Sequence, residues 1–378
     1  MTNRFDDIRP YYDSEVKEAV QRVIADQNIY PVIQYLFPEK NPEEFKAFLS
    51  TFETVYDFQI KLMHKVIRKI VEKSAKELTY SGFENITPGE SYLFIANHRD
   101  IMLDSSILQI LLHENEHSTS EITFGSNLMK SQFIIDIGRL NKMFKVNREA
   151  TGREILLASK ELSAYMRYTI KEKKQAAWIA QRSGRTKDGN DRTEQGVIKM
   201  LSMSGSKDFV ENFSELRIVP LTISYEYEPC DIQKVREMYI SSKQEYIKAP
   251  DEDLKSILAG ITDYKGRIHF SVGEPIVDKL KEINNNAKGE SEKHKQLVLE
   301  VDRQIHKDYK LWPNNYIAAD TLREDSKYSD EYTETEKAAF LNYIDEKVSA
   351  VDINDKAQIT KMMLELYSWP VLNIESYE

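Results

Sequence analysis

Between residues 78 and 277, short runs of β-forming residues alternate with longer stretches of helical pattern. The runs cover residues 92–96, 122–124, 176–180, 217–225 and 267–272. Strands that alternate with helices favour a fold in which helices cover the faces of one sheet. The sequence therefore predicts an α/β fold, with a mixed central sheet flanked by helices.

Helical segments are expected on both sides of this α/β part. Residues 13–75 contain no glycine, and residues 45–76 carry an apolar stripe typical of one amphipathic helix. After residue 277 the pattern is helical again, with an exposed loop expected at 284–286 and two closing helices at 334–352 and 355–367. We therefore predict an N-terminal helical region at 1–77, an α/β domain at 78–283 and a C-terminal helical region at 284–378.

The composition restricts the class of protein. A 378-residue chain that is 41% hydrophobic can bury a sizeable core, and its net charge of −10 argues against a general nucleic-acid binder. Its one cysteine, Cys230, excludes an internal disulfide and fits a reducing compartment. The first seven residues lack the apolar core of a signal peptide, and no segment has the roughly 18 consecutive apolar residues of a membrane span.

The charge is unevenly distributed along the chain. Residues 125–200 contain 16 Lys and Arg against 8 Asp and Glu, which gives this segment a net charge of +8. A local positive field in an acidic protein indicates an anionic ligand at one place.

A histidine stands where a predicted strand gives way to a predicted helix. Residues 97–104 read Asn-His-Arg-Asp-Ile-Met-Leu-Asp, directly after the apolar run 92–96. A carboxylate that binds one imidazole nitrogen leaves the other nitrogen free to act as a base. Asp104 is the favoured partner of His98, because Asp100 is close enough to cap the following helix. The alternative is a surface histidine beside a helix cap.

This octapeptide resembles the histidine/aspartate motif of the glycerolipid acyltransferases, although the family usually has four residues between the two side chains and this chain has five. Later blocks resemble the family in the right order, so the resemblance spans about residues 88–277. They are residues 138–148, which end on Arg148; residues 178–187; residues 218–226; and residues 266–276. In the block at 178–187, Ser183 stands where the family usually has Glu, and Arg185 lies one position earlier than the arginine of the family.

The resemblance implies an O-acyltransferase of phospholipid biosynthesis that acylates glycerol-3-phosphate or 1-acylglycerol-3-phosphate. His98 would be the general base and Asp104 would orient it. The substrate-binding residues would be Lys145, Arg148, Arg182, Ser183, Gly184 and Arg185. No cofactor or metal is implied; the co-substrate would be the thioester of coenzyme A or acyl carrier protein.

Such an enzyme is expected in the cytoplasm, bound peripherally to the inner face of the cell membrane. Two surfaces suggest themselves for this contact: the 45–76 stripe with its lysines, and Phe133 to Ile135 near Lys130, Arg139 and Lys142. The alternative for the 45–76 stripe is that it packs on the protein's own core.

Two other functions fit parts of the sequence. His113, Glu114 and His117 fit the His-Glu-x-x-His pattern of zinc proteases, but polar residues after them favour a helix end, and no third ligand block follows. A catalytically inactive lipid-binding protein of the same fold is the second alternative, because Ser183 and the longer His–Asp spacing depart from the family.

Overall fold

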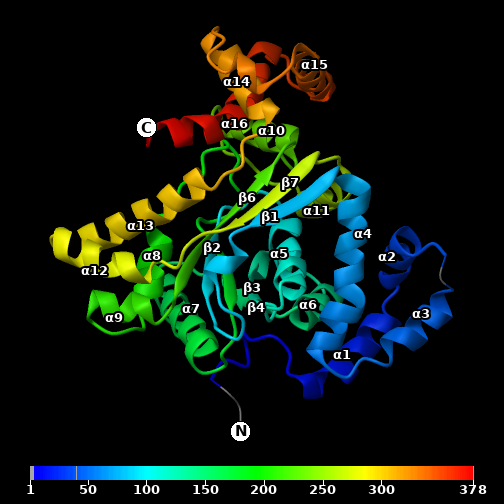
Figure 1. The fold of residues 1–378 in the computed structure, drawn as a ribbon. Helices are drawn as coiled ribbons and strands as arrows, with labels where there is room; N and C mark the ends of the chain where they lie inside the picture. The colour runs from blue at the N-terminus through cyan, green and yellow to red at the C-terminus, as the bar shows by residue number, and fades with distance from the viewer. Residues whose placement is uncertain (1–3, 40, 378) are drawn as a thin grey trace.

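The computed structural model describes residues 4–39 and 41–377 and has a seven-stranded sheet at its centre (Figure 1). The order across the sheet is β1-β7-β6-β2-β5-β3-β4. The strands are β1 (Glu77–Ser81), β2 (Leu93–Ala96), β3 (Glu121–Gly125), β4 (Met143–Val146), β5 (Ala177–Ala180), β6 (Ile218–Tyr225) and β7 (Arg267–Val272). The predicted α/β fold with a mixed sheet is confirmed. All five predicted strands are present, whereas β1 and β4 were missed.

The direction of the strands brings several loops to one edge of the sheet. Neighbouring strands pair in parallel except β6 and β7, so β2 to β6 run one way and β1 and β7 run the other. The segments that follow β2, β4 and β5 therefore leave from the same edge. Ligands of open α/β sheets bind outside this carboxyl edge.

Helices cover both faces of the sheet, as Figure 1 shows. Leu93 and Ile95 of β2 belong to a core with α7 (Arg153–Lys171), α8 (Gln195–Ser202) and α13 (Glu290–Lys307). Phe94 and Ala96 belong to the core on the other face, with α4 (His64–Ser74) and α5 (Leu103–Glu114). A parallel strand buried on both faces needs apolar side chains at every position, which explains the continuous apolar run.

Pro220 occupies a position in β6 where its missing N–H costs no hydrogen bond to β7. It is the third residue of the central strand β6. The β6–β7 ladder begins only at Leu221, which pairs with Val272. The proline lies just beyond that ladder, so the donor it lacks is not needed there.

The prediction of one helix over residues 45–76 is wrong. The segment forms α3 (Pro42–Leu49), a π-helix η1 (Asp57–Met63) and α4. The side chain of Asp57 accepts hydrogen bonds from the backbone N–H groups of Glu53 and Thr54, at 3.1 and 3.2 Å, and these bonds stabilise a turn. The apolar stripe, including Phe52 and Phe58, is buried in the core and is not a membrane-facing surface.

The remaining helices complete the shell around the sheet. They are α1 (Asp13–Ala25), α2 (Ile29–Leu36), α6 (Gln132–Leu140), α9 (Phe209–Ser214), α10 (Asp231–Ser241), α11 (Glu252–Thr262), α12 (Val277–Asn286), α14 (Pro313–Arg323), α15 (Glu334–Ala350) and α16 (Lys356–Glu375). The prediction of a loop at 284–286 is wrong, because these residues form the end of α12. Both closing helices are present, although α16 continues past residue 367. They form a third core with α10 and α14, at the top of Figure 1.

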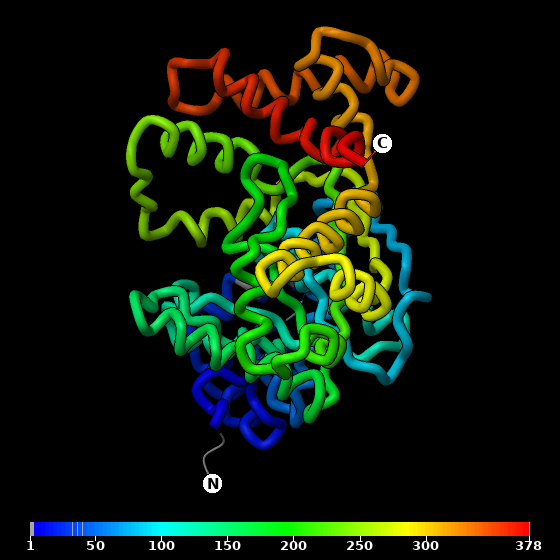
Figure 2. Tube along the Cα trace, turned by 90° about the vertical axis from the view of Figure 1, so that its left-hand side faces the viewer, coloured from blue at the N-terminus to red at the C-terminus, as the bar shows by residue number. Residues whose placement is uncertain are grey.

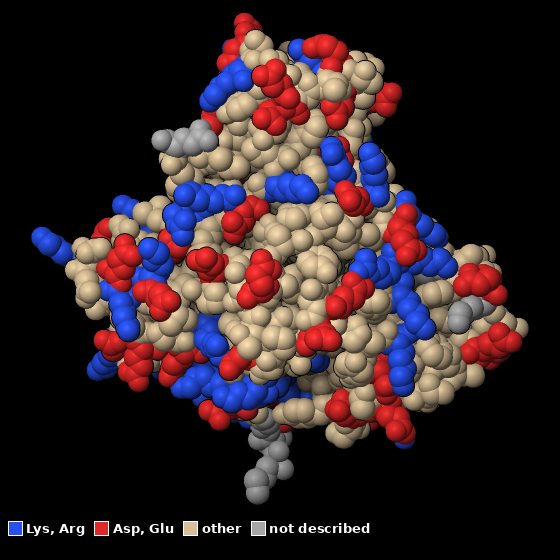
Figure 3. All heavy atoms as spheres, in the orientation of Figure 1, with Lys and Arg blue, Asp and Glu red and all other residues tan. Residues whose placement is uncertain are grey.

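The face shown in Figure 3 carries acidic and basic side chains interspersed around an uncharged centre. Every helix in the described part of the chain is too short or too polar to traverse a lipid bilayer. The division of the chain at residues 77/78 and 283/284 stays a prediction.

Candidate active site

His98 lies just beyond the carboxyl end of β2 and contacts a buried carboxylate. Its Nδ1 is 2.9 Å from Oδ2 of Asp104, in the first turn of α5. The Asp104 side chain is fully buried, whereas that of His98 is 15% exposed. The imidazole also meets Trp178 of β5 edge to face, with ring centroids 5.5 Å apart. Because Nδ1 faces the carboxylate, Nε2 is the nitrogen available to a substrate.

The carboxylate of Asp104 has a full set of hydrogen-bond donors. Oδ2 accepts from the backbone N–H groups of Arg99 and Asp100, at 2.6 and 2.9 Å, and Oδ1 accepts from the Tyr225 hydroxyl at 2.9 Å. Burial, followed by the charge of Asp104, raises the pKa of Tyr225, so this hydroxyl remains a donor. The two backbone bonds close the turn and let His98 reach Asp104 despite the additional residue between them.

Asp100 has a different position. Its Oδ1 accepts from the backbone N–H groups of Met102 and Leu103, at 2.9 and 2.7 Å, so it caps α5. Its Oδ2 is buried without a hydrogen-bond partner in the described part of the chain. Burial, and then the neighbouring Asp104, raise the pKa of Asp100. The geometry thus pairs His98 with Asp104 and leaves Asp100 as the helix cap.

We expect Asp104→Asn to reduce acyl transfer at least about 10²-fold, because the amide cannot stabilise an imidazolium by its charge. Asp100→Asn keeps an oxygen for the cap and should change the rate by less than about threefold. Initial rates of the two purified variants, with circular dichroism as the folding check, measure the difference. The reverse order of effects would assign the partner role to Asp100.

Behind His98 lies a cluster of four buried charged side chains, which we call the ion cluster: Arg99, Asp191, Glu228 and Lys234. Each is 4% exposed or less. Arg99 pairs with Asp191 at 2.5 Å and with Glu228 at 3.0 Å, and Lys234 pairs with Glu228. Burial alone would lower the pKa of Arg99, but Asp191 and Glu228 outweigh it and raise this pKa above its ordinary value. Two cations and two anions balance within the cluster.

The ion cluster joins the turn that carries His98 to the turn after β5. Asp191 accepts hydrogen bonds from the side chains of Asn97 at 2.9 Å and Thr186 at 2.8 Å. The backbone N–H of Thr186 donates to the carbonyl of His98 at 2.7 Å. His98 therefore has fixed backbone on both sides.

The same cluster reaches the C-terminal helices. The backbone N–H of Glu228 donates to the Tyr367 hydroxyl of α16 at 3.0 Å, and that hydroxyl donates to Asp231 at 2.7 Å. Gly189, between the two turns and α16, has φ +84°, and a Cβ there would lie 2.0 Å from the carbonyl oxygen of Leu366. Only glycine fits this contact.

The structure brings most of the predicted phosphate-binding residues together. Arg148, which follows β4, donates from Nη1 to the Ser183 hydroxyl at 2.5 Å. Arg182 lies 4.0 Å from Asp188, and Arg185 donates to Ser256 of α11 at 3.4 Å. Gly184 lies between Ser183 and Arg185, and its φ of +77° makes the sharp turn there possible.

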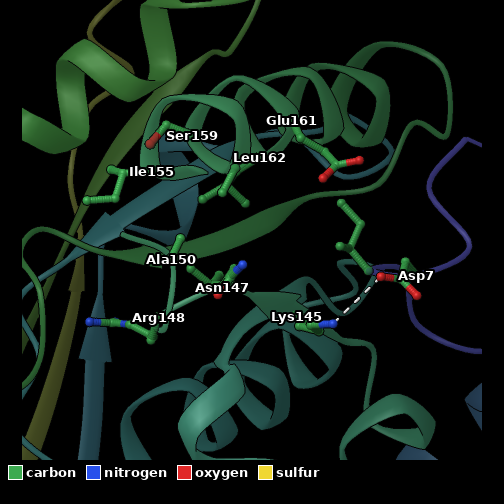
Figure 4. A pocket seen from close by; sticks show the side chains of 12 residues that line it. Asp7, Lys145, Asn147, Arg148, Ala150, Ile155, Ser159, Glu161 and Leu162 are labelled. Carbon is green, nitrogen blue, oxygen red and sulfur yellow. Dashed lines mark ion pairs between the residues drawn. The ribbon is translucent and has the colours of Figure 1, made fainter. Parts of the chain in front are cut away.

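Lys145 stands apart from this group, in a pocket of about 320 Å³ between the end of β4 and α7. Its amine lies 3.7 Å from Asp7. Figure 4 shows this ion pair, with Ile155 and Leu162 extending from α7 on the opposite wall. Arg148 belongs to the same lining, so the pocket adjoins the Arg148–Ser183 contact and combines cations with apolar surface.

A second, smaller cavity of about 80 Å³ lies between the N-terminal helices and α5. Met102, from the turn between His98 and Asp104, lines it together with Met63, Ile67 and Met143. It offers apolar space close to the turn that carries His98.

The His-Glu-x-x-His residues lie elsewhere, at the end of α5. Glu114 pairs with Arg68 and with His64, while His113 packs against the His64 ring at 5.6 Å. His117 is buried and packs near Phe83. Among the described residues, no group of three or more His, Cys, Asp or Glu side chains could hold a metal ion.

Sequence reasoning missed several residues that form this site: Tyr225, Trp178, Thr186 and the ion cluster. Trp178, Thr186 and Tyr225 lie in blocks that resemble the family but were given no role of their own, and Asp191 lies in a charge-rich turn that was interpreted only as a possible rim of the site. The one available signal was the density of charge in residues 187–192, beside a predicted strand end.

One comparison with known proteins matches the part of the chain that holds His98 and Asp104. Residues 77–224, from β1 to the last residues of β6, match the family model described as acyltransferase. No curated protein matches the chain. Among solved structures, the chain is similar to the 1-acyl-sn-glycerophosphate acyltransferase PlsC from Thermotoga maritima, with 14% identity and a TM-score of 0.37 over 78% of this chain and 94% of that one. Residues 77–224 are therefore similar to the acyltransferases, and the resemblance read from the sequence is confirmed at that level over this range.

Proposed function

We propose that this protein transfers a fatty acyl group from an acyl thioester to a hydroxyl of glycerol-3-phosphate or 1-acylglycerol-3-phosphate. The donor is the thioester of coenzyme A or acyl carrier protein. The enzyme works from the cytoplasm, at the inner face of the cell membrane. The contact between His98 Nδ1 and the buried Asp104 is the observation that carries this proposal.

In the proposed reaction, Nε2 of His98 takes the proton from the acceptor hydroxyl as its oxygen attacks the thioester carbon. The carbon–sulfur bond breaks, and the thiolate leaves with the proton that His98 returns. Asp104 holds the ring and stabilises the imidazolium between these steps. Direct transfer from donor to acceptor suits the site, because Cys230 is buried and burial raises the pKa of its thiol.

The surroundings of His98 supply places for both substrates. Arg148, Arg182 and Arg185 would bind the acceptor phosphate, for which planar guanidinium groups are well suited, and Lys145 would add charge at the rim. The apolar cavity beside Met102, of about 80 Å³, would take only a short part of the acyl chain.

We expect Arg148→Ala to raise the KM for the phosphate-bearing acceptor at least about tenfold, because hydrogen bonds to charged groups contribute about 1.5–3 kcal/mol. The KM for the acyl donor should change less than about twofold. Steady-state kinetics with each substrate varied in turn measure both constants, and Lys160→Ala on α7 is a matched control of equal charge change. A rise confined to the donor constant would move Arg148 to the donor site.

The function itself is tested with purified protein, a labelled acyl donor and a panel of acceptors. Glycerol-3-phosphate and 1-acylglycerol-3-phosphate are compared with glycerol and with an amino-acid lipid that lacks the phosphate. Transfer to a phosphate-bearing acceptor supports the proposal. No transfer to any acceptor from either donor would favour the inactive lipid-binding protein instead.

A further inference from the structure

Three consecutive apolar residues at the start of α7 are exposed. Ile155, Leu156 and Leu157 are 53, 60 and 68% exposed. Successive helix residues point about 100° apart, so all three can be exposed only where the helix end projects from the protein. Scattered exposed leucines are ordinary, but a continuous apolar tip marks a contact surface.

A second apolar projection is formed by the link from α10 to α11 and by α11 itself. Ile247 is 87% exposed, and Leu254 and Leu258 of α11 are more than half exposed. The acidic residues at the start of α11 are partly neutralised, because Asp251 pairs with Lys255 and Asp253 with Lys248.

The two projections flank the candidate active site. In Figure 2 the start of α7 and the α10–α11 link project from the same side of the molecule. Contacts place the phosphate-binding turn between them, since Arg148, just before α7, bonds Ser183, and Arg185 bonds Ser256 of α11.

Basic side chains lie between the projections. Arg148 and Arg185 donate hydrogen bonds to serine hydroxyls, whereas Arg182 lies 4.0 Å from Asp188 and Lys187 pairs with Glu237. Lys130 donates to the carbonyl of Pro250 in the α10–α11 link. Apolar tips on both sides of cationic side chains match a bilayer, whose anionic headgroups lie above its acyl chains.

We propose that these two projections and the basic side chains between them dock the protein on an anionic phospholipid bilayer, with the active site facing the membrane. The proposal rests on the proposed function, in which one substrate and the product are lipids. It replaces the surfaces suggested by the sequence. The 45–76 stripe is buried, and the amine of Lys142 bonds Thr119 and Gln175 inside the protein.

The test is co-sedimentation of the full-length protein with vesicles. Vesicles of phosphatidylcholine alone are compared with equimolar phosphatidylcholine and phosphatidylglycerol, at low and high salt. The variants are the double Leu156→Asp/Leu157→Asp, Ile247→Asp, and a matched control, Leu299→Asp. Leu299 is 46% exposed on α13.

We expect the wild type to bind the anionic vesicles and to be released by salt. The double variant should lower the partition coefficient on the order of tenfold or more, and Ile247→Asp by several-fold, because each removes an apolar side chain from the bilayer. Leu299→Asp should change it less than about twofold. Circular dichroism melting curves that match the wild type show that each variant folds.

Three outcomes would overturn the proposal: no binding of the wild type to anionic vesicles, equal loss in the control, or a wild-type dimer that the double variant converts to a monomer. The dimer would make these tips an interface between two copies of the chain. Vesicle binding requires no turnover. An inactive protein that still docks would therefore refute the proposed function alone, and an active one that ignores vesicles would refute the docking alone.

Discussion

His98→Ala leaves a folded protein whose acyl transfer falls by about 10²–10⁴, the usual cost of losing a positioned general base. The expectation rests on the 2.9 Å contact of Nδ1 with Asp104, which directs Nε2 to the substrate side. Single-turnover rates with a labelled thioester donor measure the loss directly.

His113→Ala is the matched control for this experiment. His113 lies at the far end of α5, among other histidine and tyrosine rings, and takes no part in the proposed reaction. Its rate should stay within about twofold of the wild type. If His98→Ala and the wild type turned over at comparable rates, the general-base mechanism would be contradicted.

Arg99→Met lowers the free energy of unfolding by about 3–5 kcal/mol, because it leaves Asp191 and Glu228 buried with one cation fewer. Methionine fills a similar volume, so the loss reports the charge rather than a cavity. The midpoint and slope of urea denaturation measure it.

The control for Arg99 is Lys17→Met, which removes one partner of an ion pair with Glu53 whose side chains are 68 and 67% exposed. Exposed pairs contribute little, so its unfolding curve should overlay the wild type. An Arg99→Met midpoint equal to that of the wild type would mean that the ion cluster does not stabilise the fold.

The central strands could be predicted from the sequence, and the edge strands could not. β2 and β5 are apolar at every position because helices cover both of their sides. β1 and β4 lie at the two edges of the sheet, and both carry charged or polar side chains among few buried ones. Edge strands lose the continuous apolar pattern that identifies buried ones.

In the N-terminal helices, the sequence pattern predicted too much regular structure rather than too little. The apolar spacing of residues 45–76 continues through the turn at residues 50–54, because Phe52 packs into the same core as the helices around it. Periodicity therefore predicted one helix, while the break is made by the polar contacts of Asp57 with the turn.

In the candidate site, the sequence pointed to His98 and Asp104 because they lie on one short segment at a strand end. The ion cluster has no such local pattern, since Arg99 meets its partners across more than 90 residues of chain. A charged residue is predicted to be solvent-exposed unless its partners are known. The burial of the ion cluster therefore could not be predicted from the sequence.

The ion cluster also limits how far this chain can be shortened and still fold. The segment that matches the acyltransferase family ends at residue 224, before Glu228 and Lys234, and Tyr367 lies farther on still. An excised fragment with those borders would contain the 97–104 motif and the blocks at 138–148 and 178–187. It would lack the block at 266–276, the ion-cluster members Glu228 and Lys234, and the whole of α16. We therefore expect the smallest part of this chain that folds by itself to be considerably longer than the segment that matches the acyltransferase family model.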